Sequence, residues 1–239
     1  MMGPLHRQRT SNPYKSMTVE RVLSNGLSRR VVCGGICVLL AGCTSAPQGL
    51  FSGAPPGIDR TAAIYGPIMD GSTAIPALDL DVAANADLLR QDVPFSTPYR
   101  PGTIVVSVAQ RRLYLVQRGG RALRYAVGVG REEALNFRGS AIIGQKATWP
   151  RWIPTADMIR RMPKYAAYAG GMPGGLENPL GARALYLYVG DRDSYFRIHG
   201  TNEPATIGTA VSSGCIRMFN QDAIDLYNRV PLGAPVVVL

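Results

Sequence analysis

The stretch that decides the fold is Ile198-His-Gly-Thr201, followed by Ser212-Ser-Gly-Cys-Ile-Arg217. It places the imidazole of His199 16 residues before the thiol of Cys215, with small residues beside each. A cysteine thiol has a free pKa of about 8.5, so a base must take its proton if it is to act as a nucleophile near neutral pH. We therefore interpret Cys215 as a candidate nucleophile and His199 as its base.

Two glycines adjoin these side chains. Gly214 precedes Cys215, and a glycine lets the backbone approach a ligand closely. Consecutive backbone N–H groups at this turn would point at an oxyanion that forms on an acyl group. Gly200 follows His199, and its carbonyl oxygen is expected to hold the second ring nitrogen, because the sequence identifies no carboxylate for that role.

Short segments rich in β-branched residues lie upstream of the two motifs. Three of them are separated by tight turns and predict an antiparallel meander: residues 103–108, 113–117 and 122–127. Further strands are expected at residues 184–188, 195–198 and 236–239. Two short helices are expected at residues 155–161 and 221–229, capped by Thr155 and Asn220. This pattern predicts a mainly β domain over residues 101–239, and it does not distinguish a sandwich from a barrel.

The beginning of the chain has the pattern of an export signal. Arg29 and Arg30 precede an apolar run, residues 31–41, which is about half the length needed to span a bilayer. The run ends in Leu40-Ala-Gly-Cys43, which resembles the lipobox of bacterial lipoproteins. That resemblance implies that residues 1–42 are a signal peptide and that Cys43 is the lipidated first residue of the mature chain.

The position after Cys43 bears on the membrane that would receive the anchor. Thr44 stands where lipoproteins of the inner membrane usually have Asp, so the resemblance favours the outer membrane. Residues 43–100 are rich in Pro, Gly, Ser and Ala and predict a flexible tether. The sequence does not decide whether translation starts at Met1, Met2 or Met17.

Few reactive side chains remain after the leader. Cys33 and Cys37 leave with it, so Cys215 is the one cysteine besides the anchor, and His199 is the one histidine. A disulfide within the mature domain is therefore excluded. A structural zinc site is excluded as well, because it needs four nitrogen or sulfur ligands.

The charge of the chain, +10, first suggests an anionic partner. Residues 1–42 carry six basic and one acidic side chain, which leaves 20 basic and 15 acidic ones in the rest. No run of Lys or Arg and no alternation of aromatic and basic residues occurs there, so nucleic acid is not the expected partner. A moderately basic domain facing an anionic polymer fits this distribution better.

The two motifs together resemble the L,D-transpeptidase catalytic domain, also called the YkuD domain. Its motif places a His-Gly about 16 residues before a Ser-His-Gly-Cys, as His199 and Cys215 are placed here. The resemblance covers residues 101–239, and within them residues 124–131 and 178–187 look like the proteobacterial branch of the family. One position departs from the pattern, because Ser213 stands where many members have a second histidine. The family fold is a mixed β-sandwich of two packed sheets with one or two short helices.

The resemblance implies a two-step acyl transfer on peptidoglycan in the periplasm, with no metal or other cofactor. Cys215 would attack the stem peptide between diaminopimelate and D-Ala, and an amine of a second stem or of an outer-membrane protein would resolve the thioester. Free carboxylates on the donor make Arg217 and Arg183 candidate substrate ligands, since guanidinium binds carboxylate in a bidentate manner. Thr201 and Ser213 are further candidates for substrate contact.

Two other functions remain open from the sequence. Water could resolve the same thioester, which would make the protein an L,D-carboxypeptidase. Alternatively, the domain could bind peptidoglycan without catalysis, as a lipoprotein kept for anchoring. The intact cysteine and histidine argue against the second alternative.

Overall fold

Strands dominate the part of the chain that the structure describes, residues 60–239 of a computed structural model. Nine of them form one sheet in the order β12-β10-β9-β8-β13-β4-β5-β6-β3. Their bounds are β3 (Gln91–Pro94), β4 (Ile104–Ser107), β5 (Arg112–Val116), β6 (Arg121–Ala126), β8 (Gly139–Thr148), β9 (Arg183–Val189), β10 (Arg192–His199), β12 (Ile216–Arg217) and β13 (Pro235–Val238). The expected leader, Cys43 and residues 43–59 lie outside the described residues.

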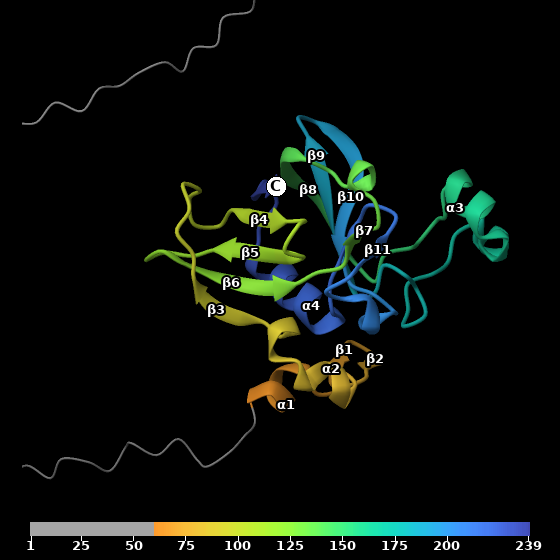
Figure 1. The fold of residues 1–239 in the computed structure, drawn as a ribbon. Coiled ribbons are helices and arrows are strands. Elements are labelled where there is room, and N and C mark those ends of the chain that lie inside the picture. Colours follow the sequence, from red (N-terminus) through yellow and green to blue (C-terminus); the bar gives the residue numbers. More distant parts are fainter. Residues whose placement is uncertain (1–59) are drawn as a thin grey trace, which may run out of the picture. The chain divides into compact units, whose positions relative to one another are not determined.

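The sheet is mixed and folds back on itself. Parallel pairs occur at β10–β12 and β13–β4, and the other pairs of the nine-stranded sheet are antiparallel. Figure 1 shows β4, β5 and β6 running across the view while β8, β9 and β10 run upward, so one half lies at a steep angle to the other. A bridge between Gly128 and Arg217 joins the end of β6 to β12. The mainly β, mixed fold expected from the sequence is confirmed, with both halves belonging to one continuous sheet.

Two short pairs and several helices complete the architecture. The pairs are β1 (Ile68–Asp70) with β2 (Thr73–Ile75), and β7 (Val129–Gly130) with β11 (Ala210–Ser212). The helices are α1 (Arg60–Tyr65), α2 (Leu80–Ala84), α3 (Ala156–Arg161) and α4 (Asn220–Arg229), with 3₁₀ turns η1 (Ala86–Leu88), η2 (Glu133–Leu135), η3 (Pro163–Tyr168) and η4 (Pro204–Thr206). Within residues 60–239, no helix combines the length and apolarity that crossing a bilayer requires.

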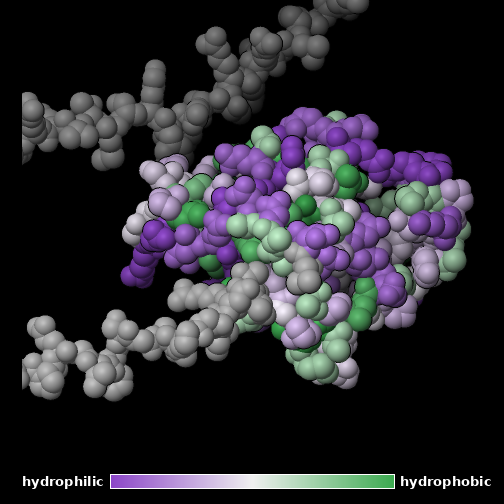
Figure 2. Space-filling view, turned by 60° about the horizontal axis from the view of Figure 1, so that its bottom comes forward, coloured by the Kyte–Doolittle hydropathy of each residue, from purple (hydrophilic) through white to green (hydrophobic). Residues whose placement is uncertain are grey.

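The main core fills the space between the two halves of the sheet and α4. Ile104 and Leu113 come from one half, Ile143 and Leu187 from the other, and all four are fully buried beside Leu226 of α4. Such side chains contribute about 1.5–3 kcal/mol each when they leave water, so their alternation along the strands holds both halves together. The face drawn in Figure 2 is largely hydrophilic, with hydrophobic residues in small separate areas.

Residues 60–94 differ from the expected tether. They form α1, β1, β2, α2, η1 and β3, and β3 adds a strand to the edge of the large sheet by pairing with β6. Tyr65, Leu78 and Leu89 are buried against Phe219 and Ile207 in a second hydrophobic cluster. The tether prediction is therefore wrong for the described part of 43–100, because isolated apolar residues in a segment without periodicity still find a surface to cover.

A buried polar network fastens the same segment to α4. The Tyr65 hydroxyl lies 3.0 Å from Oδ1 of Asp222, which is fully buried, and also accepts the backbone N–H of Arg90 at 2.6 Å. The Arg90 guanidinium in turn reaches Asp225 at 2.7 Å. Burial raises the pKa of Asp222 to about 7, although the Arg90 charge and the Tyr65 hydroxyl oppose the rise. Tyr65 and Arg90 thus hold one face of the first turns of α4.

Several local predictions hold and two do not. The meander at β4–β5–β6 is antiparallel as expected, and Thr155 caps α3 by accepting the N–H of Met158 at 3.2 Å. The ten-residue strand β8 was not expected, because its glycines interrupt the β-branched pattern. The side chain of Asn220 does not cap α4; it bonds to two other segments instead.

Candidate active site

The pairing of β10 with β12 brings the two motifs together. The strands run parallel, with Ile198 opposite Ile216 and His199 opposite Arg217. Ile198 and Ile216 both point into the main core. Because side chains alternate along a strand, His199 and Cys215 project from the other face of this strand pair. Although they are 16 residues apart in sequence, His199 and Cys215 thus lie on the same face of the strand pair.

The imidazole of His199 is held by the residue that follows it. Nδ1 lies 2.6 Å from the carbonyl oxygen of Gly200, which is the contact expected from the sequence. A carbonyl can only accept, so Nδ1 carries the proton and Nε2 is left with its lone pair. Burial is the main cause that lowers the pKa of His199, which is about 4. The charges of Arg217 and Arg197 lower this pKa further, whereas the hydrogen bond to Gly200 raises it. The ring is therefore neutral at pH 7.

Ser212 shapes the turn that carries Cys215. Its hydroxyl donates to the carbonyl oxygen of Cys215 at 2.7 Å and accepts the N–H of Gly214 at 3.0 Å. Gly214 has a φ of +127°, and a Cβ there would lie 2.4 Å from the carbonyl oxygen of Leu135. Only glycine fits both the conformation and the space.

This geometry corrects the expected oxyanion donor. The N–H of Gly214 is already engaged by Ser212, and the N–H of Gly200 donates to the carbonyl oxygen of Arg183 at 3.0 Å. Among residues 60–239, the backbone N–H groups of Ser213 and Cys215 have no acceptor. These two groups, one on each side of Gly214, are available to donate to a developing negative charge.

The thiol of Cys215 is protonated in the resting site. It is half-buried, and desolvation raises its pKa. The backbone N–H of Arg197 and the positive charges of Arg197 and Arg217 oppose this rise. The shifts of Cys215 and His199 both disfavour charge separation. The free site therefore contains a neutral thiol and a neutral imidazole.

Arg197 belongs to the site although the sequence analysis did not single it out. Its backbone N–H lowers the pKa of the Cys215 thiol, and its guanidinium is held by a bidentate pair with Asp193 at 2.7 Å and 2.7 Å. The guanidinium also lies 4.2 Å from the ring centroid of Tyr186. Alternation along β10 would have placed Arg197 on the face of His199, two residues away, which is the signal that could have found it.

Comparison with known proteins identifies the family of the domain that carries these residues. A model of the L,D-transpeptidase catalytic domain family (YkuD) matches residues 101–238, which include both motifs. The chain belongs to this family. His199 and Cys215 both lie inside this L,D-transpeptidase domain.

Two curated relatives carry the same family name. The chain is 36% identical over 141 residues to the probable L,D-transpeptidase ErfK/SrfK of Salmonella typhimurium, a match that covers 57% of this chain and 43% of that protein. It is 32% identical over 167 residues to the putative L,D-transpeptidase YkuD of Bacillus subtilis, covering 69% of this chain and 82% of that protein. The chain thus spans less than half the length of ErfK/SrfK.

One solved structure carries a different name. A protein from Brucella melitensis described as a probable carnitine operon oxidoreductase CaiA shares 50% identity, covering 67% of this chain and 99% of that one, with a TM-score of 0.45. A TM-score at this level assigns no function. The family assignment rests on the L,D-transpeptidase model and the two curated relatives.

The other predicted substrate ligands are placed differently from one another. Arg217 lies beside the L,D-transpeptidase motif, and its guanidinium meets Glu203 at 2.8 Å, a partner that is 57% exposed. Ser213 is half-buried next to Cys215, whereas Thr201 is 3% exposed and its hydroxyl accepts the N–H of Glu203. Arg217 and Ser213 therefore remain candidates for substrate contact, and Thr201 is engaged in its own turn.

Arg183 is engaged in a structural ion pair. It is 7% exposed, and its guanidinium forms a bidentate pair with Asp70 of β1 at 2.6 Å and 2.7 Å. This pair holds the pKa of Asp70 below its usual range, because the hydrogen bonds from Arg183 outweigh burial. Its position corrects the expectation that Arg183 faces the substrate.

The neutral state of His199 makes stability depend on pH. Its pKa is about 6.5 in an unfolded chain and about 4 in the folded one, so the unfolded state binds the proton first as the pH falls. We expect the free energy of unfolding to drop by about 3 kcal/mol from pH 7 to pH 4 on this account. Urea denaturation of wild type and His199→Gln measures it, as the difference between the two curves.

Asp222 has a raised pKa, so its contribution to the free energy of unfolding increases as the pH falls over the same range. Because Asp222 is present in both proteins, its contribution cancels in the difference between the two curves. Parallel pH curves for wild type and His199→Gln would show that folding does not lower the pKa of the imidazole.

Proposed function

We propose that this protein is an L,D-transpeptidase that acts on tetrapeptide stems of peptidoglycan through a thioester on Cys215. The observation that carries the proposal is the strand pair β10–β12, which presents His199 and Cys215 on one face, with Nε2 of the imidazole unprotonated. A nucleophile, a base and an orienting carbonyl are the parts that covalent acyl transfer needs.

In the first step, Nε2 of His199 takes the thiol proton while the sulfur attacks the carbonyl carbon between diaminopimelate and D-Ala. The oxyanion forms near the N–H groups of Ser213 and Cys215, which have no acceptor among the described residues. The C–N bond then breaks, and the imidazolium gives its proton to the departing amine of D-Ala. The stem remains as a thioester on Cys215.

In the second step, an amine attacks the thioester and His199 removes its proton. The sulfur leaves as a thiolate and recovers that proton, which restores the neutral pair. Arg217 can release Glu203 and pair with a carboxylate of the stem, because its present partner is largely in water and the exchange costs little. The acceptor is an amine of a second stem or of an outer-membrane protein.

Intact-mass analysis of the purified protein with a tetrapeptide donor tests this function. We expect a mass increase equal to the donor without D-Ala, located on the peptide that contains Cys215. Addition of an acceptor stem should discharge the adduct and yield a dimer. Tripeptide without dimer would favour the L,D-carboxypeptidase reaction, and absence of any adduct would favour a peptidoglycan-binding lipoprotein.

We further propose that the protein works in the periplasm, anchored by lipid on Cys43 to the outer membrane. The support for this is the Leu40-Ala-Gly-Cys43 motif and the following Thr44, together with the family's substrate class. The Cys43→Ser protein should leave the membrane fraction or remain unprocessed, and unchanged fractionation would contradict the anchor.

A further inference from the structure

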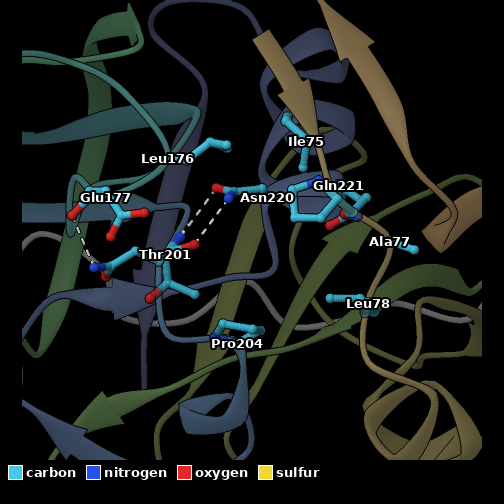
Figure 3. A pocket seen from close by; sticks show the side chains of 11 residues that line it. Ile75, Ala77, Leu78, Leu176, Glu177, Thr201, Pro204, Asn220 and Gln221 are labelled. Atoms are coloured by element: carbon cyan, nitrogen blue, oxygen red, sulfur yellow. Dashed lines mark hydrogen bonds between the residues drawn. The ribbon is translucent and has the colours of Figure 1, made fainter.

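The carboxamide of Asn220 clamps the turn that follows His199. Its Nδ2 donates to the carbonyl oxygen of Thr201 at 3.0 Å, and its Oδ1 accepts the N–H of Thr201 at 3.3 Å. Figure 3 shows these two bonds side by side. Oδ1 also accepts the N–H of Ala182 at 2.9 Å, so one buried side chain joins α4 to the start of β9 and to the turn after β10.

The backbone around Asn220 leaves room for this carboxamide. A Cβ on Gly200 would lie 2.1 Å from Oδ1 of Asn220, and a Cβ on Gly181 would lie 2.2 Å from the same atom. Both contacts are closer than any real Cβ contact, so side chains at these two positions would displace the amide. The two glycines and Asn220 form one interlocking arrangement directly behind the turn of His199.

The geometry connects Asn220 to the imidazole through a single peptide group. The N–H of Thr201 and the C=O of Gly200 are opposite ends of the same planar peptide unit. Asn220 holds the N–H end, and Nδ1 of His199 donates to the C=O end. Since the unit is rigid, fixing its N–H also fixes the direction in which its carbonyl oxygen points.

We propose that Asn220 is a positioning residue for the base His199. By holding the Gly200–Thr201 peptide, it keeps the Gly200 carbonyl aimed at Nδ1, which fixes both the tautomer and the orientation of the imidazole ring. The inference rests on the proposed transpeptidase function for its activity readout, but the clamp itself is a feature of the free protein. Asn220 touches neither substrate nor the reacting atoms.

The first turn of α4 extends this role to the N-terminal segment. Gln221 donates to the carbonyl oxygen of Pro76 at 3.1 Å, and Asp222 accepts from Tyr65. Asn220 and Gln221 also line a cavity of about 220 Å³ whose other wall contains Ile75 and Leu78. Three consecutive residues of one helical turn therefore tie the catalytic turn to residues that precede the family domain.

The test compares Asn220→Ala with wild type in two assays. In the full chain, we expect the rate constant for thioester formation to fall by about 10- to 100-fold, because a misdirected base loses part of the general-base contribution, while KM stays within about twofold. The second assay is alkylation of Cys215 by iodoacetamide, followed on the peptide that contains it. We expect the variant to react about 10-fold more slowly at pH 7. Near pH 10 it should react at the wild-type rate, because hydroxide then removes the thiol proton without help from the imidazole.

Two variants make the outcome decisive. Asn220→Asp keeps the oxygen that accepts from Thr201 and should recover most of the rate. Asn178→Ala is the matched control, because Asn178 is 0% exposed and donates to the carbonyls of Pro150 and Pro173 without contact to the turn of His199. It should lose stability and keep the wild-type alkylation profile. If Asn220→Ala does not fold, Asn220→Ser removes the same clamp with a smaller void.

Each result supports or overturns the inference. A folded Asn220→Ala protein with wild-type thioester formation and a wild-type alkylation profile would show that Asn220 is only structural. Faster alkylation at every pH would also overturn it, because the thiol would then have been uncovered rather than deprived of its base. Absence of a thioester in wild type would reject the transpeptidase function, and the alkylation profile would still decide the role of Asn220.

Discussion

Cys215→Ala protein is expected to form no adduct with a tetrapeptide donor and to lose cross-linking by at least about 1,000-fold, because no other residue in the site can carry the acyl group. The measurement is intact mass together with separation of the muropeptide products. Wild-type levels of dimer from the alanine variant would remove the thioester from the mechanism.

Cys215→Ser should be as inactive as the alanine variant. A hydroxyl is a far weaker acid than a thiol, and burial leaves His199 with a pKa of about 4, which makes it a weak base. An imidazole of this strength can assist a thiol but not a hydroxyl. Both variants should unfold at the temperature of wild type within a few degrees, which separates loss of chemistry from loss of fold.

Removal of residues 1–100 is expected to have the second large effect. A protein of residues 101–239 retains the whole match to the family model, yet it loses β3, the second hydrophobic cluster and the partners of α4. Exposing Phe219 and Ile207, both nearly fully buried in the intact fold, costs roughly 1.5–3 kcal/mol each before any polar group is counted. Because domains are stable by only about 5–15 kcal/mol, we expect this truncation to be unfolded or aggregated.

Residues 60–239 should fold where residues 101–239 do not, and circular dichroism with thermal melting distinguishes them. A cooperative transition of the shorter protein near that of the longer one would contradict the prediction. A point substitution isolates one contact of the segment. Asp70→Asn leaves the guanidinium of Arg183 buried without its counter-ion and should cost about 3 kcal/mol. Asp92→Asn breaks the exposed pair with Arg121 and should cost less than about 1 kcal/mol.

The sequence identified the two motifs of the proposed site more readily than the contacts around them. Cys215 and His199 could be singled out from the sequence because both motifs are short and their spacing is specific. Alternation along two strands then suffices to place them on one face. The oxyanion donor could not be predicted, because the assignment of each N–H depends on where the hydroxyl of Ser212 points. The partner of Arg183 could not be predicted either, because Asp70 lies 113 residues away in sequence.

The N-terminal segment shows the limit of composition as a guide. Residues 60–94 have no apolar periodicity, which is typical of a linker, yet Tyr65, Ile75 and Leu89 are each buried. Short elements of three to six residues produce no periodic signal. They are stabilised by packing against the surface that they cover. Asn220 was assigned to helix capping by its position, whereas its side chain is used by two loops that only the tertiary structure brings near.

The protonated state of Cys215 also affects how fast its sulfur is oxidised. Oxidants attack the thiolate far faster than the thiol, and damage proceeds through sulfenic to irreversible sulfinic and sulfonic acids. A resting thiol with a raised pKa exposes almost no thiolate until substrate arrives. If Cys215 is the proposed nucleophile, this low thiolate fraction protects it from oxidation, because residues 101–239 contain no second cysteine that could trap a sulfenic acid as a disulfide.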